Sequence, residues 1–353
     1  MSLWSRAVLV ALTVVVAAVA LAWGGPRQAG GVAVYTSVDD EYAKPLAARF
    51  TQRTGIPVSL RTDSEGTKTT GMLARLRQFK GRPDGDVFWN NEQSATLLLA
   101  KEGILEPYVS PQAAAIPEPY REPQGLWTGF GLRARVLIYN TRHVKPEEAP
   151  KSLEQLTDPK WRGRFCIPTP LFGTTRSHFV SLVLALGEKK GFELLRRLRE
   201  NGSAGGTRPD WLQPGNSKTR DRVAEGYFHL GLTDTDDVYL AMERGQPVQM
   251  VFLEQTADWP GVFLIPNTVA LLKGGPNPEA ARKFVDFLLD PETEEWLAAQ
   301  GARQIPVRKN VPVPQGYPRL SDYRSAEVDL ARLQAQIEPL SEQVDRLLRG
   351  VDR

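Results

Sequence analysis

A cluster of hydroxyls and carboxylates in the second half of the chain is the strongest candidate for a functional site. The run Gly231–Tyr239 follows a short apolar stretch and carries Asp234, Thr235, Asp236 and Asp237 directly before a helical pattern. A buried strand therefore ends in acidic groups at the start of a helix. Because ligands of open α/β sheets bind at the carboxyl ends of the strands, we interpret this turn as one wall of a ligand site.

Helix capping offers a competing explanation for part of this cluster. Asp and Thr are favoured N-cap residues, and the helix dipole favours Asp in a first turn. A cap and one acidic residue would account for two of the three aspartates, with Asp234 as the cap. The remaining carboxylate needs a partner, since like charges this close repel each other. We therefore expect a cation or several hydrogen-bond donors to face Asp236 or Asp237.

A second polar cluster opens another helical pattern. Gly173, Thr174 and Thr175 directly precede an apolar helix. Free backbone N–H groups and hydroxyls at a helix N-terminus form a natural anion site. Threonine also begins many helices as a simple cap, so the pattern leaves both roles open. Arg133 and Arg176 are candidate charge partners for a bound anion, because guanidinium groups suit phosphate.

Polar residues also follow several other predicted strands. This distribution is typical of a cleft between two lobes that grips a small polar ligand. The further candidate ligand-binding residues at these positions are Ser37, Asn90, Asn91, Asn216 and Glu254.

The sequence contains no recognisable catalytic or nucleotide-binding motif. It lacks a Gly-x-Ser-x-Gly elbow, a phosphate-binding loop with Gly-Lys-Ser/Thr, a metalloprotease helix and a dinucleotide fingerprint. The single cysteine, Cys166, excludes an internal disulfide, and the three histidines show no ligand spacing. We expect a binding protein that is not an enzyme, with no cofactor and no assigned metal ligand. The rival interpretation is a secreted hydrolase that uses Asp236 and Asp237.

Length and charge narrow the class of protein further. The 353 residues are 41% hydrophobic, enough for two lobes or one large α/β domain. The net charge of +3 without a strong basic block speaks against nucleic acid as a partner. Residues 1–30 contain Arg6 and then a continuous apolar run, which predicts a signal peptide and export. An uncleaved anchor is the alternative, because about 17 apolar residues approach membrane-spanning length.

Hydrophobic periodicity predicts a helix-covered parallel sheet. Strand-like stretches at 31–37, 56–61 and 86–89 are separated by amphipathic helical patterns. Two further strands at 127–130 and 133–139, joined through a glycine, suit a crossover between lobes. The expected fold class is therefore α/β.

Seven stretches of the chain together suggest a family likeness. They are Val32–Ser37, Gly85–Trp89, Gly103–Pro107, Trp161–Phe165, Gly173–Thr175, Ile265–Val269 and Arg282–Leu288. In these stretches the chain resembles the bacterial family 1 extracellular solute-binding proteins, in particular their ferric-iron-binding branch. The likeness extends over nearly the whole chain after the N-terminal segment.

The resemblance implies a type II periplasmic-binding-protein fold, with two α/β lobes joined by crossing hinge strands and a ligand cleft between them. It places the N-lobe in residues 31–128 and 259–305, and the C-lobe in 129–258. A C-terminal helical segment, 306–353, is expected to pack on the C-lobe. The implied partners are a small-molecule ligand and a membrane ABC permease, and we expect a monomer in the periplasm or another extracytoplasmic space.

The chain departs from the ferric branch at the positions that bear on metal binding. That branch carries a Tyr-Tyr pair where this chain has Asp236 and Asp237, a His in place of Asp39 and a Glu in place of Asn91. The resemblance thereby adds Asp39 to the expected cleft residues. Aspartates still hold hard cations through oxygen, so the departures weaken an iron site without excluding it. We expect no iron site built on tyrosinate.

The positions that contact an anion in the family match this chain better. They correspond to Gly173–Thr175 and Asn216, with Asp234 in place of an Asn, and Arg133 falls where the ferric branch has an arginine in the cleft. Our main expectation for the ligand is therefore an organic phosphate or phosphonate. Ferric iron or an iron chelate is the alternative.

Overall fold

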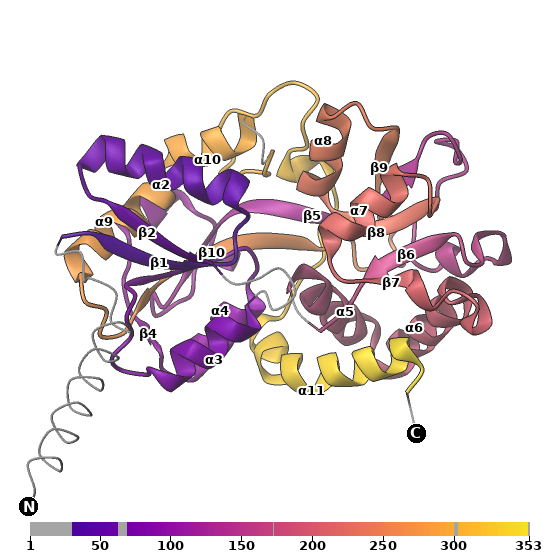
Figure 1. Ribbon diagram of the computed structural model, residues 1–353, viewed down its shortest axis with the longest axis horizontal. Coiled ribbons are helices and arrows are strands. Elements are labelled where there is room, and N and C mark those ends of the chain that lie inside the picture. Colours follow the sequence, from indigo (N-terminus) through magenta and orange to yellow (C-terminus); the bar gives the residue numbers. More distant parts are fainter. Residues whose placement is uncertain (1–29, 63–68, 172, 300–302, 352–353) are drawn as a thin grey trace, which may run out of the picture.

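The computed structural model describes residues 30–62, 69–171, 173–299 and 303–351, which form two lobes side by side (Figure 1). The strands are β1 (Val32–Thr36), β2 (Val58–Thr62), β3 (Val87–Asn90), β4 (Leu105–Glu106), β5 (Thr128–Asn140), β6 (Phe165–Pro168), β7 (Leu212–Gln213), β8 (Leu230–Asp234), β9 (Val248–Phe252) and β10 (Leu264–Leu272). The α-helices are α2 (Asp40–Thr54), α3 (Thr70–Gln78), α4 (Ser94–Lys101), α5 (Gly173–Leu186), α6 (Glu188–Gly202), α7 (Asn216–Ala224), α8 (Thr235–Glu243), α9 (Pro278–Leu288), α10 (Pro291–Ala299) and α11 (Leu330–Arg349). Short 3-10 helices occupy Pro111–Ala115, Glu118–Tyr120, Gln155–Thr157, Pro159–Trp161, Ala204–Gly206, Pro209–Trp211 and Leu320–Asp322.

The strands form a mixed sheet with the order β2-β1-β3-β10-β5-β8-β6-β7, to which β4 adds beside β10 and β9 beside β5. β1 pairs in parallel with β2 and β3, and β6 pairs in parallel with β7 and β8. β5 and β10 run antiparallel to their neighbours. The predicted α/β fold class is confirmed, and β1, β2 and β3, the strands from which the sequence predicted a parallel sheet, do pair in parallel. The whole sheet is mixed because β5 and β10, which cross between the lobes, run antiparallel to the strands beside them.

β5 and β10 join the two lobes (Figure 1). The first half of β5 pairs with β10, and its second half pairs with β8 and β9. The two short strands expected around Gly131 are one continuous strand of 13 residues. Gly131 has a φ of +48°, a backbone conformation that favours glycine, and an added Cβ would lie 2.3 Å from the side-chain oxygen of Gln304.

The hydrophobic core lies on both faces of the sheet and continues through both lobes. Side chains alternate along a strand, and in β5 Val136 and Ile138 join one core cluster while Leu137 and Tyr139 join the other. Residues of α2, α7, α8, α9 and α10 complete the first cluster. Residues of α3, α4, α5, α6 and α11 complete the second. The same division into helices above and below the sheet is visible in Figure 1.

The C-terminal helix α11 contacts both lobes. It packs against α5 and α6, where Arg199 donates a hydrogen bond to the carbonyl of Leu347 at 3.1 Å. It also packs against α4, where Gln334 donates to the carbonyl of Leu97 at 2.6 Å. The helix therefore bridges the lobes in addition to packing on the C-lobe.

The predicted signal peptide, residues 1–30, lies outside the described residues apart from Gly30. In the part of the chain that the structure describes, no helix has the length and apolar character needed to cross a membrane.

Candidate functional site

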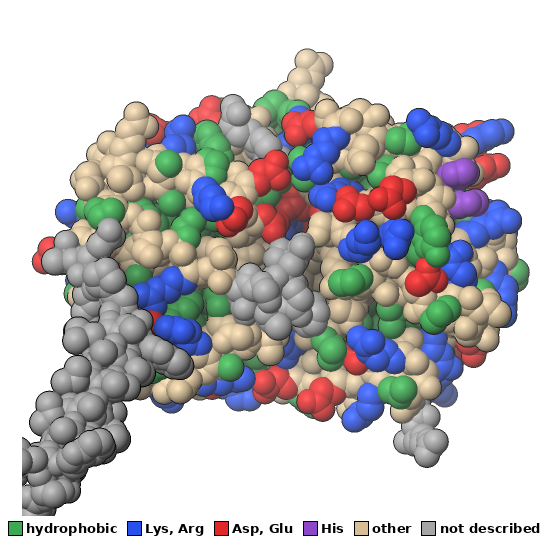
Figure 2. Space-filling model, viewed as in Figure 1, with side chains coloured by type: hydrophobic (Ala, Val, Ile, Leu, Met, Phe, Trp, Pro, Cys, Tyr) green, Lys and Arg blue, Asp and Glu red, His purple; other side chains and the backbone are tan. Residues whose placement is uncertain are grey.

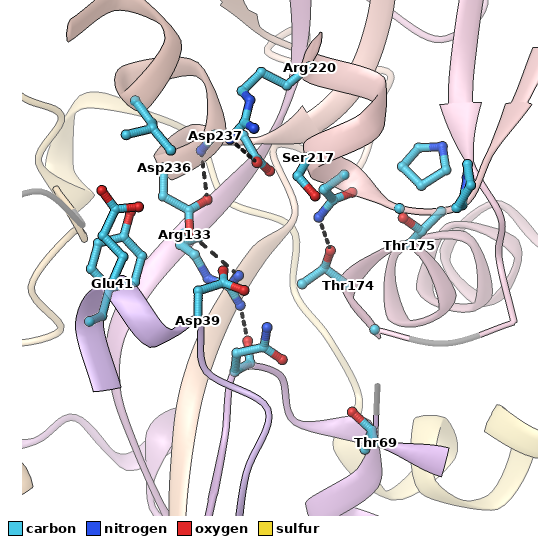
Figure 3. Close-up of a pocket in the computed structure, with 18 of the residues that line it drawn as sticks. Asp39, Glu41, Thr69, Arg133, Thr174, Thr175, Ser217, Arg220, Asp236 and Asp237 are labelled. Atoms are coloured by element: carbon cyan, nitrogen blue, oxygen red, sulfur yellow. Dashed lines mark hydrogen bonds and ion pairs between the residues drawn. The ribbon is translucent and has the colours of Figure 1, made fainter. Parts of the chain in front are cut away.

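A cavity of about 260 Å³ lies between the lobes, where several helices begin. Residues from the N-termini of α2, α3, α5, α7 and α8 line it. Figure 2 shows acidic side chains in the recess between the two halves of the molecule, and Figure 3 shows the interior. Each helix directs the positive end of its dipole toward this space, so the backbone itself favours negative charge here.

One side of the cavity, which we call the acid wall, consists of Asp39, Glu41, Asp236 and Asp237. Asp39 is the N-cap residue of α2, and Glu41 lies in the first turn of that helix. Asp236 and Asp237 occupy the first turn of α8. Local sequence thus explains why each helix starts with acids, and the meeting of α2 and α8 brings carboxylates from both lobes into one cavity (Figure 3).

Asp234 lies behind the acid wall and is fully buried. Arg135 donates a hydrogen bond to its Oδ1 at 2.7 Å, and Arg133 approaches its Oδ2 at 3.3 Å. Asn216 donates to the same Oδ2 at 2.8 Å. With two arginines and an amide around it, this carboxylate acts as an anchor that joins β5, α7 and β8. Asp234 ends β8 and occupies the N-cap position of α8, but its side chain makes no capping hydrogen bond, so the capping role considered from the sequence is not observed.

Asp236 and Asp237 have weaker cationic partners. Arg133 lies 3.7 Å from Asp236, and Arg220 lies 3.4 Å from Asp237. The Thr233 hydroxyl donates to Asp237 at 2.7 Å. Burial raises the pKa of Asp236 well above its ordinary value, and burial followed by repulsion from neighbouring carboxylates raises the pKa of Asp237 to about 6. These two groups are therefore short of positive charge.

The three aspartates form the kind of cluster that holds a metal ion. One carboxylate oxygen from each of Asp234, Asp236 and Asp237 lies within 4.8 Å of the others. Hard cations prefer oxygen ligands of this type. Asp234 already forms ion pairs with Arg133 and Arg135. Asp236 and Asp237 are therefore the better candidates for metal ligands.

A second side of the cavity, which we call the donor wall, carries hydroxyls and an amide. Its members are Thr69 at the start of α3, Thr174 and Thr175 at the start of α5, and Asn216 and Ser217 at the start of α7. Asn216 donates to the Thr174 hydroxyl at 2.9 Å, which fixes both side chains. Neutral donors at helix N-termini suit the oxygen atoms of an anion.

Three predicted site residues lie beneath the cavity instead of lining it. The hydroxyl of Ser37 lies within donating distance of the side-chain oxygens of Asn90 and Asn91. It also accepts a hydrogen bond from the backbone N–H of Asn91 at 3.0 Å. The Thr235 hydroxyl accepts from the backbone of Ala134 at 3.2 Å. Ser37, Asn90 and Thr235 therefore position the turns that present Asn91 and the acid wall. Asn91 itself lines the cavity, and Arg133 donates to its carbonyl oxygen.

Glu254 and Arg176 were expected at the site, but neither is among the residues that line the cavity. Glu254 adopts a positive φ of +63°, and its carboxylate accepts a hydrogen bond from the backbone N–H of Leu153 at 2.6 Å. Burial raises the pKa of this carboxyl to about 7. The positive φ turns the Glu254 side chain toward the loop at Leu153. A sequence pattern of an apolar strand followed by a polar residue does not reveal this change of direction.

The cavity also contains residues that the sequence interpretation missed. Glu41 and Tyr42 line the cavity, and neither was among the predicted site residues. Thr69, Arg220 and Arg244 line it as well. Glu41, Tyr42 and Thr69 lie at or near helix N-termini, and this position could have identified them as cavity residues from the sequence. Arg220 and Arg244 lie later in α7 and directly after α8, and only the packing of those helices brings them inward.

The structure also brings together two of the histidines. The rings of His143 and His229 stack with centroids 4.6 Å apart and planes 6° from parallel. Neither lines the cavity. Among the described residues, no cluster of three or more His, Cys, Asp or Glu includes this pair.

The continuous sheet, the two crossing strands and the cavity between the lobes define a periplasmic-binding-protein fold. A family model for bacterial extracellular solute-binding proteins matches residues 45–322, and the chain belongs to this family. The class provides the substrate-binding component of ABC importers, which confirms that part of the sequence interpretation.

Similar proteins agree on the fold and differ in what their names say they bind. Iron uptake protein A1 of Synechocystis sp. is 28% identical over 323 residues, which cover 89% of this chain and 86% of that protein. Iron-bound HitA from Pseudomonas aeruginosa has a TM-score of 0.78 at 22% identity, over 89% of this chain and 99% of its own. AfuA from Actinobacillus pleuropneumoniae, with exogenous fructose-6-phosphate bound, has a TM-score of 0.76 at 22% identity, over 91% and 97%.

Proposed function

We propose that this protein captures ferric iron as a small chelate in the interlobe cavity and delivers it to an ABC permease. The acid wall carries this proposal, because carboxylates from both lobes face one cavity and two of them, Asp236 and Asp237, have only distant cationic partners. A hard trivalent cation would supply the missing positive charge through oxygen ligands. The relative named iron uptake protein A1 supports iron, which reverses our preference for an organic phosphate.

The proposed iron ligands are Asp236 and Asp237 from the C-lobe, with Asp39 and Glu41 closing from the N-lobe. Tyr42 lies beside them. Burial, and then the charge of Asp236, raises the pKa of the Tyr42 phenol, so we assign it no tyrosinate role. The donor wall would hold the anionic chelator, since its hydroxyls and helix N-termini favour negatively charged oxygen.

An organic phosphate or phosphonate is the second candidate ligand. The donor wall favours it, with Arg220 and Arg244 as cationic side chains in the same cavity. The AfuA structure with fructose-6-phosphate has the same fold. The acid wall would then accept hydrogen bonds from sugar hydroxyls or from an amine, and it would repel a second anionic group.

We propose that the protein works as an exported monomer in the periplasm or on the outer side of the membrane, with residues 1–30 as its signal peptide. Its partners are the solute and the permease, without a role for nucleic acid. It binds and releases its ligand unchanged, so ligand recovered intact after prolonged incubation would support binding over hydrolysis at Asp236 and Asp237.

Calorimetric titration of the purified protein with ferric citrate, citrate alone and fructose 6-phosphate tests this function. We expect tight binding of ferric citrate, loss of most of that affinity in Asp236→Asn, and no effect of Glu279→Gln, an exposed carboxylate on α9. Elemental analysis of protein purified without refolding should find iron. Tight binding of fructose 6-phosphate, with ferric citrate inert, would replace iron by the second candidate.

A further inference from the structure

Thr69 adopts a backbone conformation that side chains disfavour. It is the N-cap residue of α3, with φ +76° and ψ −36°. Residues with a Cβ rarely adopt a positive φ, and β-branched residues adopt it least readily. Such strain persists only where the surroundings impose it, and it is concentrated at sites of binding and catalysis.

The Thr69 side chain also destabilises the ligand-free protein, in addition to the strain of its backbone. It is 4% exposed, and among the described residues its Oγ1 has no hydrogen-bond partner. A buried hydroxyl without a partner destabilises the folded state, and native structures contain few of them. Thr69 lines the cavity, and in Figure 3 it lies at the end away from Asp236 and Asp237. Its hydroxyl oxygen is turned toward the other lining residues.

We propose that Thr69 is a ligand-contacting residue of the N-lobe, whose hydroxyl hydrogen-bonds an oxygen of the chelator bound with the iron. This inference rests on the proposed function of the cavity as the solute site. It places a hydrogen-bonding contact on the N-lobe side of the donor wall, in addition to those at the starts of α5 and α7. The bound solute then supplies the partner that the hydroxyl lacks in the protein alone.

The position of Thr69 also constrains the size of the solute. A solute that touches both Thr69 and the acid wall must extend across the cavity, which a bare metal ion does not. The volume of about 260 Å³ compares with about 30 Å³ for one water molecule, so an ion alone would leave most of the space to water. The cargo is therefore a chelate of a hydroxycarboxylate or a similarly sized oxyanion.

Three substitutions separate the hydroxyl from the strain. Thr69→Val removes the hydroxyl and keeps the shape, Thr69→Ser keeps the hydroxyl, and Thr69→Gly removes both the hydroxyl and the strain. Ala204→Gly is the matched control, because Ala204 also has a positive φ, +48°, and does not line the cavity. Each variant is titrated with ferric citrate by calorimetry and melted without ligand.

We expect Thr69→Val and Thr69→Gly to weaken ferric citrate binding about tenfold, the scale of one hydrogen bond to a charged group. Thr69→Ser and Ala204→Gly should bind as the wild type does. Thr69→Gly should also raise the Tm of the ligand-free protein, so that its stability rises while its affinity falls. Wild-type affinity in Thr69→Val would overturn the inference and leave the proposed function intact.

The wild-type protein provides the separate test of the proposed function. If it binds fructose 6-phosphate and not ferric citrate, iron is wrong as the cargo, and the same Thr69 variants titrated with fructose 6-phosphate decide the role of the hydroxyl. A wild-type protein that binds neither compound overturns both proposals.

Discussion

Replacing Asp237 with asparagine should stabilise the ligand-free protein at neutral pH. Burial first, and Asp234 second, raise the pKa of Asp237 from 3.8 to about 6. One pKa unit corresponds to 1.36 kcal/mol, so ionising Asp237 at pH 7 costs the folded state about 3 kcal/mol relative to the unfolded chain. This cost already includes the favourable contacts of the carboxylate with Thr233 and Arg220, because both lower the pKa of Asp237. Asparagine avoids the cost, and its side-chain oxygen can still accept the Thr233 hydrogen bond, so the expected gain is about 2–3 kcal/mol.

The gain should depend on pH in a defined direction. Because the pKa of Asp237 is higher in the folded state, that state binds more protons than the unfolded chain between about pH 4 and pH 6. The wild-type protein therefore loses stability from this group as the pH rises through that window. Near pH 4 the carboxyl is protonated in the folded state and costs little, so the advantage of Asp237→Asn should largely vanish.

Urea denaturation of both proteins without ligand, at about pH 4 and pH 7, measures this difference. Glu279→Gln is the control for removing a carboxylate, because its side chain is exposed on α9. An Asp237→Asn variant that is less stable than the wild type at pH 7 would refute the reasoning. An advantage of equal size at both pH values would refute it as well, since it would not come from ionisation.

Three further predictions concern the cavity and its support. Arg135→Met should lower the free energy of unfolding by about 3 kcal/mol, because Asp234 loses its 2.7 Å partner while buried, and unchanged urea denaturation would contradict this. Affinity for ferric citrate should fall as the pH drops from 7 to 5, since the raised pKa values of Asp236 and Asp237 favour protonation there, and calorimetry that shows no pH dependence would remove them as iron ligands. Iron-loaded protein should lack a visible phenolate band, and a coloured protein that bleaches in Tyr42→Phe would show that Tyr42 ligates iron.

Local chemistry made much of the architecture predictable from the sequence. The alternation of apolar strands and amphipathic helices, with glycine or polar residues between them, indicated an α/β fold. The acids at the start of α8 and the Gly-Thr-Thr start of α5 were located correctly because capping and helix-dipole preferences act within one turn. The sequence did not reveal that β5 is continuous through Gly131, since glycine interrupts a strand pattern whether or not the chain turns.

By itself, then, the sequence determined the elements and the residue types at their ends, because these depend on neighbours a few positions away. The tertiary structure decided which ends meet. Arg135 and Asp234 are 99 residues apart and form a 2.7 Å contact, while Glu254, at an equally promising strand end, is turned away by a positive φ. Thr69 and Tyr42 reach the cavity only because α3 and α2 converge with α5 and α8 across the lobes. A binding site assembled from distant segments depends on packing, and packing is a property of the whole chain.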